Sequence, residues 1–124
     1  MKLTDLAIGD LILINNTPHK IQAIDSIDAE VQADDELYYV GKDRCHSEDK
    51  IEGIPITLEI LEKNGWWYYS NDMWQHEEVG FYIEKWNGRF QCYDINDIKL
   101  DSVHQLQQTL RLCGLNELAD NFKI

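Results

Sequence analysis

The sequence has 124 residues and a formal net charge of −12, from 11 basic and 23 acidic side chains. Phosphate binding depends on Lys and Arg side chains that displace counterions, so this charge disfavours direct binding to DNA or RNA. The hydrophobic fraction of 44% supports a buried core and argues against disorder, and no apolar run approaches the length of a membrane span.

The first residues contain no apolar run of signal-peptide length, so we expect the mature chain to begin at Met1 and to remain in the cytoplasm. The three cysteines are odd in number and have no paired spacing, which fits neither a disulfide framework nor a zinc site. We interpret Cys45, Cys92 and Cys113 as buried or incidental thiols, and we expect no metal and no cofactor.

Residues 1–55 are predicted to form a small β-barrel-like subdomain and residues 56–124 a second segment, the two making one compact unit. Residues 5–10 are typical of a turn before a strand near 11–15, and Asn15-Asn16-Thr17-Pro18 is a further turn cluster. Additional strands are expected at 20–25, 27–33 and 36–40. This pattern predicts an α+β fold with an N-terminal small twisted antiparallel sheet or SH3-like barrel.

The strand expected at 27–33 shows the clearest alternation of apolar and polar residues in this half. Its predicted apolar face consists of Ile27, Ala29, Val31 and Ala33. Asp34-Asp35-Glu36 lacks the ligand spacing and glycine of a calcium loop, so we interpret it as a turn. Residues 43–50 are charged and lack periodicity, which indicates an exposed loop.

A short helix is predicted to begin after Thr57, a good N-cap residue, and to end at Gly65. A capping box is absent because Ile60 occupies the position that would need Glu or Gln. Ile56, Ile60 and Leu61 are expected to form the buried side of this helix, which must be held by packing because it is short.

The segment 66–93 holds ten of the 13 aromatic residues. Asn87-Gly88 separates two apolar and aromatic runs, and this dipeptide is a strong signal for a two-residue β-hairpin turn. Such a turn sets the register and places Trp86 opposite Arg89, with four further pairs back to Tyr82 and Tyr93. We therefore predict an aromatic antiparallel hairpin or meander.

The predicted register divides this hairpin into two faces. The core face collects Phe81, Ile83, Phe90 and Cys92, with the stem of Lys85. The second face is amphipathic, and exposed Trp and Tyr beside Arg suit recognition because they bury a large area at low entropic cost. The candidate partner-binding or ligand-binding residues are Trp67, Tyr69, Tyr82, Trp86, Arg89 and Tyr93. The alternative is that this second face packs against the N-terminal sheet or the first helix.

The last quarter of the chain is predicted to be helical. Asp101 or Ser102 caps a helix that ends at Cys113 and Gly114, and a short helical turn follows from Asn116 through Leu118 and Phe122. The buried stripe of the long helix is expected to contain Val103, Leu106, Leu110 and Cys113. The residues expected to face outward or sideways are Gln105, Gln107, Gln108 and Arg111. We expect the helices to cover the apolar face of the hairpin.

Three stretches, LAIGDLILINNTPHKIQAID, IPITLEILEKNGWWYYS and VHQLQQTLRLCGL, carry a resemblance over most of the chain. The chain resembles a family of small uncharacterised proteins from gut-bacterial and bacteriophage genomes. It departs from that pattern at Leu58, where proline is expected after the capping threonine. The resemblance implies a setting in the mobile elements of gut anaerobes and supplies no reaction and no catalytic residues.

No phosphate-binding loop, dinucleotide turn, serine elbow or metalloprotease helix is present in the sequence. His76-Glu77-Glu78 is the best polar cluster, and we interpret it as a solvated polar edge, since adjacent residues of a strand alternate faces. The leading hypothesis is a non-catalytic protein-binding module of a bacterial mobile element or phage. The alternatives are a small-molecule or nucleotide-binding protein that uses the aromatic sheet, and an acidic inhibitor that mimics nucleic acid.

Overall fold

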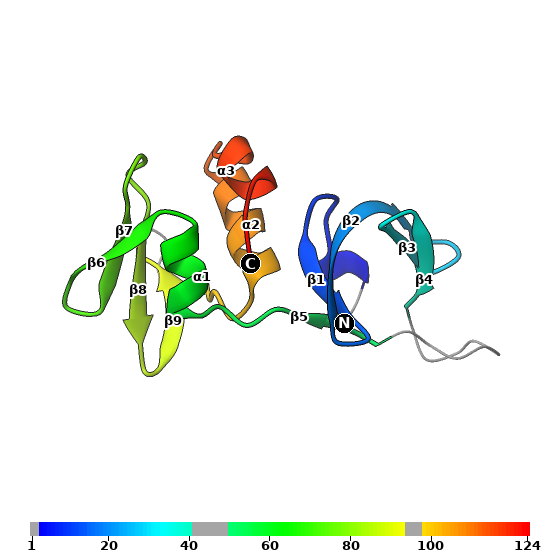
Figure 1. Ribbon diagram of the computed structural model, residues 1–124, viewed down its shortest axis with the longest axis horizontal. Coiled ribbons are helices and arrows are strands. Elements are labelled where there is room, and N and C mark those ends of the chain that lie inside the picture. The colour runs from blue at the N-terminus through cyan, green and yellow to red at the C-terminus, as the bar shows by residue number, and fades with distance from the viewer. Residues whose placement is uncertain (1–2, 41–49, 94–97) are drawn as a thin grey trace. The chain divides into compact units, whose positions relative to one another are not determined.

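The computed structural model describes residues 3–40, 50–93 and 98–124 (Figure 1). It contains a five-stranded and a four-stranded antiparallel sheet and several short helices, which confirms the predicted α+β class. The chain divides into two compact units, Met1–Ile54 and Pro55–Ile124, and each is described by itself. Cys45, His46 and most of the loop predicted at 43–50 lie outside the described residues.

The first unit begins with a short 3-10 helix, η1 (Leu3–Asp5), and continues as a sheet with the strand order β4-β3-β2-β1-β5. Its strands are β1 (Leu11–Ile14), β2 (Thr17–Asp25), β3 (Glu30–Ala33), β4 (Glu36–Tyr39) and β5 (Ile51–Gly53). A β-bulge between Ile21 and Ala23 interrupts the pairing of the long β2 with β3. The first four strands form a meander and β5 returns to β1, which is the strand order of an SH3-like barrel.

Two-residue turns with positive φ join β1 to β2 and β3 to β4. Asn15 and Asn16 have φ of 51° and 66°, so they alone form the turn, whereas the predicted turn cluster also included Thr17 and Pro18. Pro18 is tolerated in β2 because it lies opposite Leu13, one pair beyond the hydrogen-bonded pair that closes the turn. Its nitrogen therefore points away from β1, and β3 pairs with β2 only from Ile21 onward.

The strand expected at 27–33 is shorter than predicted. β3 begins at Glu30, and Ile27, placed on its apolar face by the alternation, is 93% exposed. The Asp25 side chain accepts hydrogen bonds from the backbone N–H of Ile27 and of Asp28, and Ala29 has φ of 51°, so residues 26–29 form a loop. Val31 and Ala33 are fully buried, as predicted. The core of this unit consists of Leu6, Ile12, Ile14, Ile21, Val31, Ala33, Val40 and Ile51.

The second unit contains three helices and a sheet with the strand order β6-β7-β8-β9 (Figure 1). The helices are α1 (Leu58–Lys63), α2 (Val103–Leu112) and α3 (Asn116–Asp120). The strands are β6 (Trp66–Ser70), β7 (Met73–His76), β8 (Tyr82–Trp86) and β9 (Arg89–Cys92).

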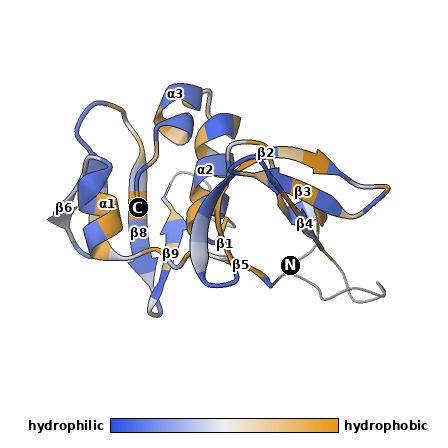
Figure 2. Cartoon of the chain, turned by 45° about the vertical axis from the view of Figure 1, so that its right-hand side comes forward, coloured by the Kyte–Doolittle hydropathy of each residue, from blue (hydrophilic) through white to orange (hydrophobic). Residues whose placement is uncertain are grey.

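Helix α1 begins and ends as predicted. The Thr57 side chain accepts a hydrogen bond from the Ile60 N–H at 3.2 Å, and Gly65 follows the helix with φ of 92°. Leu61 is fully buried and Ile56 is buried, whereas Ile60 is only half-buried. The helix therefore presents a narrow apolar side to the unit and a polar one to solvent (Figure 2).

The β8–β9 hairpin has the predicted register, with Trp86 opposite Arg89 and Ile83 opposite Cys92. Asn87 and Gly88 have φ of 51° and 77°, as a type I′ turn requires. On the core face Phe81, Ile83 and Cys92 are buried. Phe90 on the same face is half-buried, and the Lys85 Nζ lies 5.5 Å from the centre of its ring.

Ser102 is the N-cap of α2, and its backbone N–H donates to the Gln105 side chain at 3.1 Å. Leu106 and Leu110 of the predicted stripe are fully buried, but Cys113 is exposed because it lies at the C-cap. Gln107, expected to face outward or sideways, is also buried, and its amide donates to the Ala119 carbonyl of α3 at 3.0 Å. This hydrogen bond satisfies the polar group that the prediction kept in solvent.

Candidate functional site

The register of the second sheet assigns each strand residue to one of two faces. Trp74 lies opposite Ile83 and Trp66 opposite His76, so these residues share the buried face. Trp66 of this face also packs against Phe122 of the C-terminal segment, with ring centres 6.3 Å apart. Trp67, Gln75 and Tyr82 lie opposite one another across β6, β7 and β8 and belong to the second face.

The second face carries the predicted site residues. Trp67 and Tyr69 come from β6, and Tyr82 and Trp86 come from β8. The β8–β9 hairpin places Arg89 opposite Trp86 and Tyr93 next to Tyr82 on the same face. We call this set the aromatic face; its residues are Trp67, Tyr69, Tyr82, Trp86, Arg89 and Tyr93.

Four members of the aromatic face form a continuous row of rings across the sheet. The ring centres are 6.1 Å apart for Trp67 and Tyr69, 6.4 Å for Tyr69 and Tyr82, and 6.1 Å for Tyr82 and Tyr93. A β-bulge between Tyr68 and Ser70 interrupts the pairing of β6 with β7 at Tyr69. The row thus joins residues from β6, β8 and the end of β9.

The aromatic face is exposed in this structure. Trp67 is 47% exposed and Trp86 65%, whereas Trp66 is 1% and Trp74 7% exposed. Tyr69 and Tyr93 are also exposed, and Tyr82 is half-buried between them. Folded proteins place most such rings in their cores, so these exposed rings form an unusual apolar patch on one face of the sheet.

Two pairs of hydrogen-bonded polar side chains lie beside the rings of the aromatic face. The Arg89 guanidinium makes two hydrogen bonds to the Asp101 carboxylate, one of them 3.0 Å long between Nε and Oδ1. This hydrogen-bonded carboxylate raises the pKa of Arg89 above its ordinary value. The Gln91 amide donates to the Glu84 carboxylate on the same face. Arg89 is therefore held in one orientation beside the rings.

The rings of the row are tilted against one another. The interplanar angles along it are 64°, 75° and 62°. A flat ligand that stacked on all four rings would need them to be nearly coplanar, so this arrangement does not form a single stacking platform. Tilted rings instead offer both faces and edges to the uneven surface of a protein.

His76 is not at the solvated polar edge that the sequence predicted. Its side chain is buried, Nε2 donates to the Asn64 carbonyl at 2.8 Å, and Nδ1 accepts from the Glu78 N–H at 3.1 Å. Because both ring nitrogens have partners within the chain, the imidazole is a structural group and is not positioned to act as a base. No local pattern predicts this burial, because the acceptor, the Asn64 carbonyl, lies at the end of a different element, α1.

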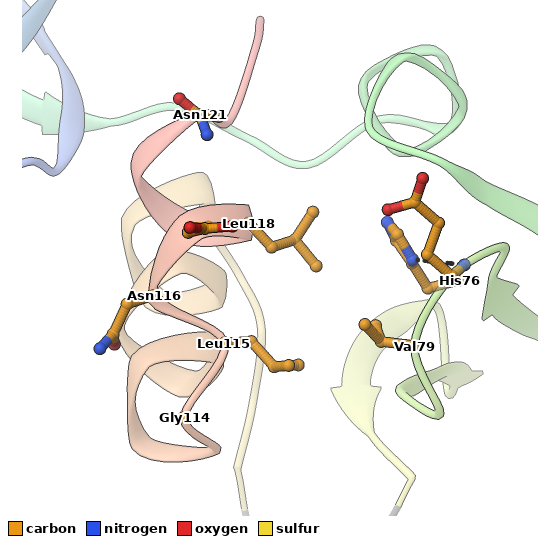
Figure 3. A pocket seen from close by; sticks show the side chains of 9 residues that line it. His76, Val79, Gly114, Leu115, Asn116, Leu118 and Asn121 are labelled. Carbon is orange, nitrogen blue, oxygen red and sulfur yellow. Dashed lines mark hydrogen bonds between the residues drawn. The ribbon is translucent and has the colours of Figure 1, made fainter.

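A groove of 650 Å³ lies beside His76, between the β7–β8 connection and α3. Val79, Leu115 and Leu118 point into it from its two sides (Figure 3). Its polar lining comes from His76, Glu78, Asn116, Glu117 and Asn121. It brings together no nucleophile and base, so it does not form a catalytic set.

The described residues contain no group of three or more His, Cys, Asp or Glu side chains that could hold a metal ion. Asp34 lies in a turn, and its carboxylate contacts the His19 ring. None of the helices in the described ranges is long and apolar enough to cross a membrane.

Sequence reasoning did not find the part that β7 plays in the aromatic face. Gln75 lies opposite both Trp67 and Tyr82, so its side chain belongs to this face and lies between them. The signal was the dipeptide Asn71-Asp72, whose φ values of 51° and 56° make a second two-residue turn. Recognising that turn would have paired β6 with β7, but the bulge between Tyr68 and Ser70 shifts the register by one residue, so the turn alone does not place Trp67 opposite Gln75.

We expect the two exposed tryptophans to account for the accessible fluorescence of the protein. Acrylamide should quench Trp67 and Trp86 readily and leave Trp66 and Trp74 largely protected, because only the first two rings reach solvent. A variant with Trp67→Phe and Trp86→Phe should therefore lose most of its quenchable emission. Equal quenching of this variant and the wild type would show that the aromatic face is covered in solution.

Comparison with protein-family models, curated proteins and solved structures finds no match to this chain.

Proposed function

We propose that this chain is a non-catalytic protein-binding module and that the aromatic face is its contact surface. The observation that carries the proposal is the set of exposed Trp and Tyr side chains on one face of a sheet whose other face is mostly buried. Aromatic side chains and arginine dominate the binding energy of protein interfaces. The resemblance to proteins of gut-bacterial and bacteriophage genomes suggests a mobile-element setting for the partner.

The size of the aromatic face supports a protein partner. Four exposed aromatic side chains and the partly buried Tyr82 offer on the order of 500 Å² of contact surface. A standard interface buries about 800 Å² on each partner, so the face and its rim together reach that scale. Patches of this size on a single chain are commonly functional.

Charge and ring geometry argue against the other classes of ligand. The net charge of −12 opposes a nucleic acid backbone, and the one Arg on the face is paired with Asp101. The tilt of the rings opposes stacking on one flat ligand. A protein partner need not carry a phosphate backbone and need not be flat, so neither argument applies to it.

The proposal is tested by affinity capture from an extract of a gut anaerobe, with recovery of bound proteins quantified by mass spectrometry. We expect a specific partner to bind the wild type and to be lost with the double variant Trp67→Ala, Trp86→Ala. Each truncation of a central interface aromatic costs about 2 kcal/mol or more of binding free energy, so the double variant should recover almost none.

Two control variants separate a binding effect from a loss of folding. Tyr68→Ala removes a ring that is 56% exposed, as Tyr69 is, but lies on the opposite side of β6. Leu112→Ala removes an exposed apolar side chain at the end of α2. A partner that is recovered equally by the wild type and the double variant, or lost equally with the controls, would contradict the proposal.

A further inference from the structure

The sequence contains two Asn-Gly dipeptides, Asn64-Gly65 and Asn87-Gly88, and both lie in the second unit. In this dipeptide the backbone nitrogen of the glycine can attack the asparagine side chain, because glycine has no side chain that obstructs the approach. Asparagine is one of the thermolabile residue types for this reason. The surroundings of the two dipeptides differ, so one can be compared directly with the other.

The Asn64-Gly65 dipeptide is held on both of its reacting groups. Asn64 is buried, and its amide donates to the Ile60 carbonyl and to the Lys123 carbonyl. Its side-chain oxygen accepts from the Lys123 N–H, and the Gly65 N–H donates to the Glu62 carbonyl at 3.2 Å. An attack of the Gly65 nitrogen on this side chain therefore requires the end of α1 and the C-terminal segment to open first.

The Asn87-Gly88 dipeptide is free to react. It forms the tip of the β8–β9 hairpin, and both of its residues are exposed (Figure 1). Among the described residues, neither the Asn87 side chain nor the Gly88 N–H has a hydrogen-bond partner. No atom lies within 4 Å of the position that a Cβ of residue 88 would take. The tip of a hairpin opens locally at low cost, without unfolding of the unit.

We propose that Asn87 is a site of spontaneous deamidation in the folded protein and that Asn64 is protected from it. In the first step the Gly88 backbone nitrogen forms a bond to the Asn87 Cγ and the bond from Cγ to Nδ2 breaks. Ammonia leaves with the proton of the Gly88 N–H. The product is a cyclic imide that joins the side chain of residue 87 to the main chain.

Water completes the reaction by opening the imide ring. It adds to one of the two ring carbonyl carbons and breaks the bond from that carbon to the Gly88 nitrogen, which regains a proton. Addition at Cγ gives an aspartate at position 87. Addition at the main-chain carbonyl carbon gives an isoaspartate, in which the main chain runs through Cβ and Cγ. Either product carries a carboxylate in place of the amide and releases a proton.

The two products have different effects on the hairpin. An Asp-Gly dipeptide suits a type I′ turn as Asn-Gly does, so the aspartate form keeps the register of Trp86 with Arg89. Isoaspartate adds an atom to the main chain of a turn whose length determines the register, so this pair loses its geometry. Trp86 and Arg89 belong to the aromatic face, and the isoaspartate form therefore disrupts one end of it.

The test is incubation of the native protein in mildly alkaline buffer, with both asparagines followed over time by peptide mapping and mass spectrometry. We expect Asn64 to react on the order of 100-fold more slowly than Asn87, because three hydrogen bonds of its side chain must break first. In concentrated urea the two sites should react at similar rates, since each is followed by glycine. The urea arm thus shows that the difference comes from the fold.

Two variants test the chemistry and its effect on the hairpin. Gly88→Ala places a methyl group beside the attacking nitrogen and should slow the loss of the Asn87 amide several-fold. Asn87→Asp carries the new charge without the longer main chain, so its Arg89 amide should stay protected from hydrogen exchange. The purified isoaspartate form should lose about ten-fold of this protection, the effect of one lost hydrogen bond.

Three results would overturn the inference. The first is an Asn87 that stays intact in the native protein while it reacts in urea. The second is equal reaction of Asn87 and Asn64 in the native protein. The third, a hairpin equally protected in the isoaspartate form and in Asn87→Asp, would overturn the predicted effect on the register.

Discussion

Replacing Gly65 with alanine should lower the free energy of unfolding by about 3 kcal/mol, from the left-handed backbone and from steric overlap together. Gly65 has φ of 92°, and a Cβ atom there would lie 2.8 Å from the His76 Nε2. This nitrogen cannot move freely, because it donates to the Asn64 carbonyl inside the unit. The new methyl group must displace the imidazole or distort the end of α1.

Gly114→Ala and Gly88→Ala are matched controls for this prediction. Both glycines have positive φ, at 79° and 77°, but no atom lies within 4 Å of the Cβ that each would gain. These variants should cost about 1 kcal/mol each, the contribution of the backbone alone. The three free energies are measured by urea denaturation, and a Gly65→Ala value no larger than the controls would show that His76 is not held in place.

The two-residue turns show how much of the fold can be predicted from the sequence. Asn87-Gly88 was recognised because both positions tolerate positive φ at low cost, and its register then followed without further information. Asp34-Asp35 and Asn71-Asp72 form turns of the same length with less favourable residues. They are stabilised by the strands that they connect, which sequence propensity does not report.

The error at Ile27 has a local physical cause. The alternation of Ile27, Ala29 and Val31 continues across the loop and into β3, so periodicity alone cannot locate the start of the strand. The start is determined by Asp25, whose side chain accepts from two backbone N–H groups and directs the chain into a loop. A one-residue polar contact of this kind leaves no periodic signal.

Long-range hydrogen bonds account for the errors at His76 and Gln107. His76 was interpreted as part of a solvated polar edge from strand alternation, and Gln107 was expected to face outward or sideways from the helical periodicity. Each is instead buried with a backbone carbonyl as acceptor, 12 residues away in the sequence in both cases. The aromatic face, in contrast, followed from strand alternation and hairpin register, which are local properties.

The second unit buries some of its polar side chains and exposes some of its largest aromatic side chains. Buried polar side chains such as His76 and Gln107 hold the connections between elements, and large aromatic rings such as Trp67 and Trp86 remain exposed. Stability alone favours the opposite use of these residue types. The exposed rings are thus the part of this unit that its own fold does not explain.

Asn64→Ala should lower the free energy of unfolding by about 3 kcal/mol, roughly 1 kcal/mol for each of three lost hydrogen bonds. The Asn64 amide donates to the Ile60 carbonyl at 2.8 Å and to the Lys123 carbonyl at 2.7 Å. Its oxygen accepts from the Lys123 N–H at 2.8 Å. The side chain thus joins the end of α1 to the C-terminal segment, which positions Phe122 against Trp66.

A double-mutant cycle isolates this connection. A chain that ends at Phe122 lacks Lys123 and so loses two of the three hydrogen bonds while it retains the buried Phe122 ring. In that background Asn64→Ala should cost only about 1 kcal/mol, which leaves a coupling free energy of about 2 kcal/mol between the two changes. Additive effects in urea denaturation would show that Asn64 acts only as the C-cap of α1, and that packing of Phe122 alone holds the C-terminal segment.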